Sequence, residues 1–166
     1  VKTRQYLERV LRVNNIPFTL QYFSTTIPVT SKSSLKADKQ NISCLSTSFV
    51  SGKINTTNIL SSLISSQENI RTSNINFNPK SKGISCSNFY FAPSVAISTG
   101  DLSKILKAKK VSGSVVVKKY SYKSANILIG NTSKPKNIII AHYDSIQTGA
   151  IDNASGVALV LSLLID

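Results

Sequence analysis

The sequence predicts an α/β fold in which a mixed sheet is begun but not finished, and into which a β-rich domain is inserted. Residues 2–24 have the pattern of a helix followed by a strand, residues 28–112 form short apolar clusters between turns, and residues 137–165 combine an apolar strand with an apolar helix. We therefore expect one domain made of residues 1–27 and 113–166, interrupted by a second domain of residues 28–112.

The first two elements follow from hydrophobic periodicity. Apolar side chains recur at helical spacing between residues 2 and 14, with charged side chains between them: Tyr6, Leu7, Val10, Leu11 and Val13. This pattern predicts an amphipathic helix. Phe18, Leu20 and Tyr22 then alternate with polar residues, which predicts a strand over residues 16–24.

The middle segment, residues 28–112, contains turn signals at Ser51-Gly52, Asn78-Pro79 and Lys82-Gly83. Between these turns, apolar spacing predicts a helix over residues 55–67, a strand over residues 88–98 and a short helix over residues 101–108. A β-rich insertion fits this succession of short elements.

The last segment, residues 113–166, opens with two β-prone runs, residues 114–119 and 125–129, for which we expect an antiparallel hairpin. Three consecutive isoleucines in residues 137–141 predict a strand buried on both faces. Residues 154–165 are apolar nearly all round, which predicts a buried helix.

Metal-ligating side chains follow the predicted strand of residues 137–141. His142 and Asp144 stand two positions apart at its C-terminal end, where open α/β sheets place their ligands. Asp152 follows ten positions after His142, across a loop that contains Gly149. Imidazole nitrogen and carboxylate oxygen are ligands of zinc. Asp144 is placed to accept the second ring N–H of His142 and so to orient it.

The pattern His142-x-Asp144, followed by Gly149-Ala150-x-Asp152-Asn153-x-Ser155-Gly156, resembles that of the co-catalytic di-zinc exopeptidases, which include secreted aminopeptidases and glutamate carboxypeptidases. The resemblance implies that His142 ligates one zinc, that Asp152 bridges two zinc ions, and that Asp144 is a catalytic-site residue that orients His142. It further implies hydrolysis of a peptide substrate by a metal-activated water. An aminopeptidase is the expected member.

A second resemblance concerns the inserted segment. Residues 93–102 resemble the end of a protease-associated domain, a module that is inserted in this peptidase family after the first helix and strand. An unrelated β-rich insertion is the alternative.

Other ligands that the family uses are not found after Asp152. His142 is the sole histidine of the sequence, and Glu8 and Glu68 are isolated, so that no Glu-Glu pair exists. We therefore expect this chain to be the N-terminal part of a peptidase, lacking the C-terminal part of the domain. By itself it is expected to be inactive and to bind zinc weakly, because two ligands do not close a zinc site.

Three alternatives stay open. The motif could be an ordinary turn and helix cap beside a packed histidine. The protein could be a non-catalytic relative that keeps the fold for binding. Third, the lysine-rich middle of the chain could bind a polyanion. Lysine and arginine outnumber acidic residues by 20 to 7, a net charge of +13, but no nucleic-acid-binding motif accompanies them. We therefore expect the lysines to form a face exposed to solvent, rather than a surface that binds nucleic acid.

Composition sets the remaining limits. No apolar stretch is long enough to span a membrane, and the sequence does not define an oligomeric state. Cys44 and Cys86 could be buried thiols or a disulfide. Four segments match the acceptor pattern for N-glycosylation, beginning at Asn41, Asn55, Asn131 and Asn153. These matches slightly favour a secreted protein.

Overall fold

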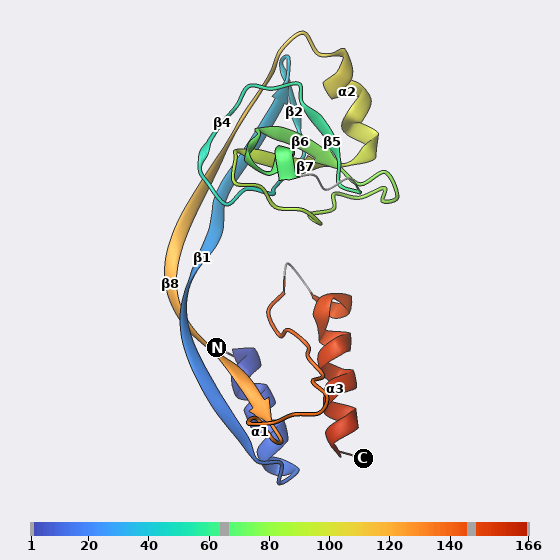
Figure 1. The fold of residues 1–166 in the computed structure, drawn as a ribbon. Helices are drawn as coiled ribbons and strands as arrows, with labels where there is room; N and C mark the ends of the chain where they lie inside the picture. Colours follow the sequence, from blue (N-terminus) through green and yellow to red (C-terminus); the bar gives the residue numbers. More distant parts are fainter. Residues whose placement is uncertain (1, 64–66, 146–148, 166) are drawn as a thin grey trace. The chain divides into compact units, whose positions relative to one another are not determined.

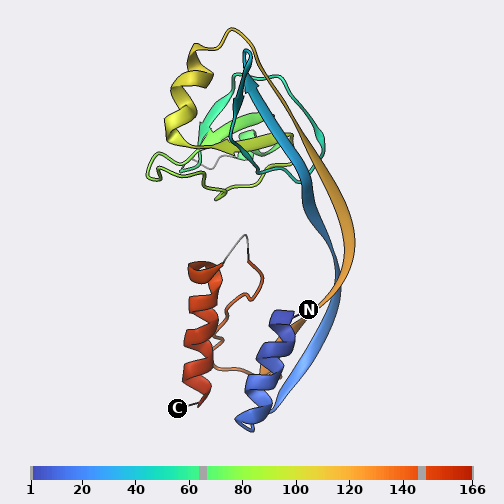
Figure 2. The same cartoon turned by 180° about the vertical axis from the view of Figure 1, so that it is seen from behind.

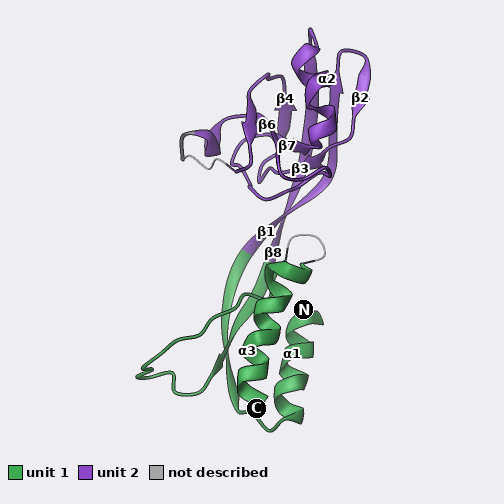
Figure 3. Ribbon diagram, turned by 90° about the vertical axis from the view of Figure 1, so that its right-hand side faces the viewer, with its two compact units in different colours: residues 1–25, 122–166 green, residues 26–121 purple. Residues whose placement is uncertain are grey.

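The computed structural model describes residues 2–63, 67–145 and 149–165 (Figures 1 and 2). Two compact units make up the chain: unit 1, residues 1–25 and 122–166, and unit 2, residues 26–121 (Figure 3). The long strands β1 (Phe18–Ala37) and β8 (Val111–Ile129) contribute residues to both units. The fold is mixed α/β, as the sequence predicts.

Unit 1 begins with helix α1 (Lys2–Val13), which confirms the first predicted element. Leu7 and Leu11 are its buried residues, one turn apart on the same face. On the charged face, Glu8 pairs with Arg4 at 2.9 Å and with Arg12 at 3.4 Å. Each of these i, i+4 pairs adds a few tenths of a kcal/mol to the helix.

Strand β1 begins at Phe18, inside the predicted strand, but it continues to Ala37. The predicted hairpin of residues 114–129 is wrong, because β8 runs without interruption through residues 120–123. These four residues, Tyr-Ser-Tyr-Lys, include no Gly, Pro, Asn or Asp to form a tight turn, so the strand continues. Its partner is β1, which has 20 residues against 19 in β8.

Unit 2 contains most of the sheet structure. One sheet has the order β2-β1-β8-β4 and the other the order β3-β7-β6-β5. The remaining strands are β2 (Gln40–Ile42), β3 (Leu45–Ser46), β4 (Gly52–Ile54), β5 (Ile59–Ser61), β6 (Asn74–Phe77) and β7 (Ser94–Ile97). Two 3₁₀ turns, Gln67–Arg71 and Thr99–Asp101, and helix α2 (Leu102–Lys107) complete the unit.

Helix α2 confirms the helix predicted for residues 101–108. The helix predicted for residues 55–67 is wrong, because Ile59 starts strand β5 and pairs with Ile75 of β6. A β-branched residue with a strand beside it favours sheet over helix. Ile64, on the predicted helical face, lies outside the described residues. The strand predicted for residues 88–98 is confined to Ser94–Ile97, after Pro93.

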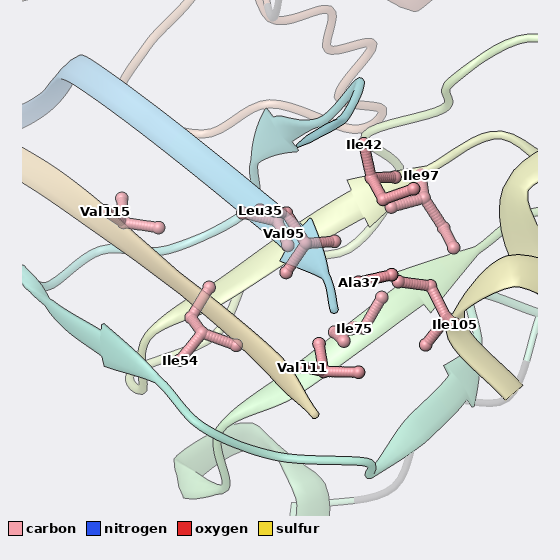
Figure 4. Close-up of a cluster of buried hydrophobic side chains, with 10 residues drawn as sticks. All are labelled: Leu35, Ala37, Ile42, Ile54, Ile75, Val95, Ile97, Ile105, Val111 and Val115. Atoms are coloured by element: carbon pink, nitrogen blue, oxygen red, sulfur yellow. The ribbon is translucent and has the colours of Figure 1, made fainter. Parts of the chain in front are cut away.

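The hydrophobic core of unit 2 lies between the two sheets and α2 (Figure 4). It contains Leu35, Ala37, Ile42, Ile54, Ile75, Val95, Ile97, Ile105, Val111 and Val115. Three partly buried side chains pack against this cluster and extend it: Cys44, Ile59 and Phe77. Burial of the Cys44 thiol raises its pKa, because the charged thiolate is poorly solvated there. No disulfide joins Cys44 to Cys86.

The end of unit 1 differs most from expectation. Residues 137–141 form no strand, and Ile138 and Ile140 are 75% and 84% exposed. The buried strand predicted here is therefore wrong for this structure. A central strand needs hydrogen-bonding neighbours, and no described strand pairs with these residues. Helix α3 (Gly156–Ile165) confirms the last predicted helix, but none of its described side chains is buried.

None of the helices within the described ranges has the length and apolar character that crossing a membrane requires.

Candidate metal centre

The irregular segment that carries His142 is attached to β8 through Tyr143. The Tyr143 hydroxyl donates a hydrogen bond to the carbonyl of Ala125, a buried residue near the end of that strand. His142 and Asp144 flank this tyrosine. The hydrogen bond of Tyr143 therefore restrains the backbone from which the side chains of His142 and Asp144 extend.

His142 lies between the two carboxylates that the sequence singles out. Its Nδ1 is 3.2 Å from Asp144 Oδ1 and 3.2 Å from the Asp144 carbonyl oxygen. Its Nε2 is 2.9 Å from Asp152 Oδ1. The structure thus brings together all three predicted site residues, with Asp144 on one ring nitrogen and Asp152 on the other.

Glycines stand on both sides of Asp152 at positions where a side chain would be strained or would clash. Gly149 has φ +62°, a left-handed conformation that glycine adopts without steric cost. An ideal Cβ on Gly156 would lie 2.2 Å from Asn153 Oδ1, so a side chain there would displace Asn153. Between them, the turn Ala150–Ser155 leaves helical geometry at Asp152 and Asn153. Asp152 therefore extends from irregular backbone just before α3.

Two carboxylates beside one imidazole change its protonation. Partial desolvation lowers the pKa of His142, but the Asp144 carbonyl and the charges of Asp144 and Asp152 outweigh it, so the pKa is raised. Because the pKa is raised, the protonated ring stabilises the folded state at any pH below the ordinary pKa of 6.5. This stabilisation is lost as the pH rises through the raised pKa. Protons therefore compete with a metal ion for Nε2.

An NMR titration of the His142 ring tests this arrangement. We expect a midpoint above pH 6.5 in the 166-residue chain. The midpoint should be lower in Asp152→Asn, because the substitution removes the negative charge that lies beside Nε2. Asp38→Asn in unit 2 is the matched control and should leave the midpoint unchanged. A wild-type midpoint at or below 6.5 would contradict the geometry described.

The residues present fit part of a zinc site. Nε2 of His142 and Oδ1 of Asp152 converge, and both are ligand atoms that zinc uses. However, within residues 2–63, 67–145 and 149–165 no group of three or more His, Cys, Asp or Glu side chains is arranged to hold a metal ion. The side chains of His142 and Asp152 are also 55% and 84% exposed. The chain therefore supplies two candidate ligands and one orienting carboxylate.

Comparison with known families bears directly on this segment. The model of peptidase family M28 matches residues 126–165, which include His142, Asp144 and Asp152. The predicted resemblance to co-catalytic zinc exopeptidases is confirmed. No curated protein matches the chain.

Solved structures show the same fold over nearly the whole chain. A zinc aminopeptidase from Bacillus subtilis matches 99% of this chain with 18% sequence identity and a TM-score of 0.58. An aminopeptidase from Aneurinibacillus sp. strain AM-1 matches 96% of it with 19% identity and a TM-score of 0.58. The chain spans about half the length of these structures, 50% and 51%.

The sequence did not indicate the part that Tyr143 plays in holding the site. A tyrosine between two candidate ligands gives no signal of its own, because its partner is a main-chain carbonyl 18 residues earlier. Only the position of β8 beside the segment reveals it.

Proposed function

We propose that this chain is the N-terminal portion of a zinc-dependent exopeptidase of the aminopeptidase type, with a peptide as substrate. One observation carries the proposal. His142 Nε2 and Asp152 Oδ1 lie 2.9 Å apart across a ten-residue separation, inside the segment that matches peptidase family M28. Two lone-pair donors that meet in this way are suited to share a cation.

Each residue has a distinct role in this proposal. His142 would bind one zinc through Nε2, and Asp152 would bridge two zinc ions with its carboxylate. Asp144 would accept the Nδ1–H of His142, which fixes the tautomer that leaves Nε2 free for metal. When bound, the two zinc ions supply a water of lowered pKa and stabilise the negative charge that develops on the peptide carbonyl oxygen.

The measurement that tests this proposal is metal analysis of the complete protein together with the gene sequence beyond residue 166. We expect about two equivalents of zinc, since the co-catalytic mechanism needs a pair. We also expect a Glu-Glu pair, a further acidic ligand and a second histidine. Zinc-free protein that still binds a peptide would instead indicate a non-catalytic relative, and absence of the further ligands would remove the enzyme assignment.

We also propose that the middle of the chain, residues 28–112, is an inserted module of the protease-associated type. Unit 2 has its own hydrophobic core, and it is inserted in the chain between the parts of β1 and β8 that belong to unit 1. An experimental structure of this unit that does not superpose on protease-associated domains would contradict the assignment.

A further inference from the structure

Most of the positive charge of the chain belongs to unit 2. Residues 26–121 contain 13 basic and 3 acidic residues, a difference of +10 out of the total of +13. A peptidase site in unit 1 does not account for this charge.

Two segments that are far apart in the sequence bring a group of these lysines together. The turn between β1 and β2 contains Asp38, whose N–H donates to the Lys110 carbonyl at 2.7 Å. Its carboxylate accepts the N–H groups of Lys110 at 2.9 Å and Lys109 at 3.3 Å. Figures 1 and 2 show this turn and the end of α2 at the same end of unit 2. The two segments are residues 36–39, at the end of β1 and in the turn, and residues 107–110, at and after the end of α2. We call five exposed lysines of these segments the basic patch: Lys36, Lys39, Lys107, Lys109 and Lys110.

Nearby carboxylates do not neutralise the basic patch. The carboxylate of Asp38 offsets only one of the five lysine charges, and its oxygens accept main-chain N–H groups rather than lysine ammonium groups. Asp101, at the start of α2, is held by Lys104 at 2.7 Å, and this hydrogen bond lowers the pKa of Asp101. Among the ion pairs of the described ranges, none includes a lysine of the patch.

The chemistry of the basic patch favours a lipid surface over nucleic acid. Single-stranded nucleic acid is bound by aromatic side chains on which bases stack, and the five lysines come without an aromatic residue in either segment. Instead Leu106, which is 66% exposed, stands directly before Lys107. An exposed apolar side chain next to exposed lysines suits an anionic bilayer, where lysines are attracted to lipid phosphates and an apolar side chain can enter the headgroup region.

We propose that the basic patch, together with Leu106, docks unit 2 on the surface of an anionic lipid bilayer. The docking is peripheral and electrostatic, so it is strong at low ionic strength and weakens with added salt. It is independent of the proposed peptidase activity, because none of its residues belongs to the candidate metal centre.

The test is co-sedimentation of the 166-residue chain with phosphatidylcholine vesicles that either contain or lack phosphatidylserine. We expect binding only to the anionic vesicles, and loss of that binding at high salt. Lys109→Gln combined with Lys110→Gln should weaken it about 30-fold, from roughly 1 kcal/mol per lysine near an anionic surface. Leu106→Ser should weaken binding while leaving its salt dependence unchanged.

The matched control is Lys118→Gln combined with Lys119→Gln. These exposed lysines lie on β8, which begins just after Lys110, and Lys118 is roughly 26 Å farther along the chain than Lys110 at about 3.3 Å per residue. The control should bind like the wild type, and all variants should unfold at the same denaturant concentration. Equal weakening by both pairs would show that only net charge matters and would overturn the proposal. Binding to heparin or nucleic acid without binding to anionic vesicles would overturn it as well.

Discussion

Ile75→Ala is expected to lower the free energy of unfolding of unit 2 by roughly 2–5 kcal/mol, the range for removing a large aliphatic side chain from a packed core. Ile75 is fully buried and lies on β6, the strand that pairs with both β5 and β7. Its register partners are Ile59 on one side and Val95 on the other. Deleting its side chain therefore leaves a cavity that two neighbouring strands have to close.

Urea denaturation of the 166-residue chain measures this effect. Ile138→Ala is the matched control, since it removes the same atoms from a side chain that is 75% exposed. We expect the control to change the free energy of unfolding by no more than about 0.5 kcal/mol. Similar effects of the two substitutions would contradict the core described for unit 2.

Asp144→Asn in the complete protein is expected to reduce zinc affinity or peptidase activity by roughly 10- to 100-fold, the usual cost of losing a carboxylate that orients a metal-bound histidine. Asp144 Oδ1 is 3.2 Å from Nδ1 of His142. An amide at this position can donate as well as accept, so it no longer specifies which ring nitrogen carries the proton. This prediction depends on the proposed function.

Zinc affinity by competition with a chelator and peptidase kinetics are the two readouts. Asp101→Asn is the control, because Asp101 is an acidic residue of unit 2 that pairs with Lys104 and not with the candidate ligands. The control should keep wild-type zinc affinity. Unchanged affinity and activity in Asp144→Asn would show that Asp144 does not orient His142.

Local periodicity was sufficient for helices α1 and α2. The apolar spacing in residues 2–14 and 101–108 depends only on near neighbours, and α1 and α2 form where that spacing predicts them. The juxtaposition of His142 and Asp152 was also predictable, because a short glycine-containing loop limits how far the two residues can separate.

The errors arise where distant partners decide the conformation. Residues 55–67 have helical apolar spacing, but β6 stands beside Ile59 and draws it into a sheet. Residues 114–129 look like two strands, but the long β1 gives them one continuous partner. Three isoleucines predict a strand at residues 137–141, yet the described chain offers no neighbouring strand to pair with them. None of these partners is visible in a local sequence window.

Anomalous scattering at the zinc edge from crystals of the complete protein tests the central claim most directly, namely that His142 and Asp152 share a metal centre. We predict zinc at about 2.0–2.2 Å from His142 Nε2 and from a carboxylate oxygen of Asp152. Zinc bound elsewhere, with these two side chains separated by more than about 8 Å, would contradict the claim, because no single ion could then contact both.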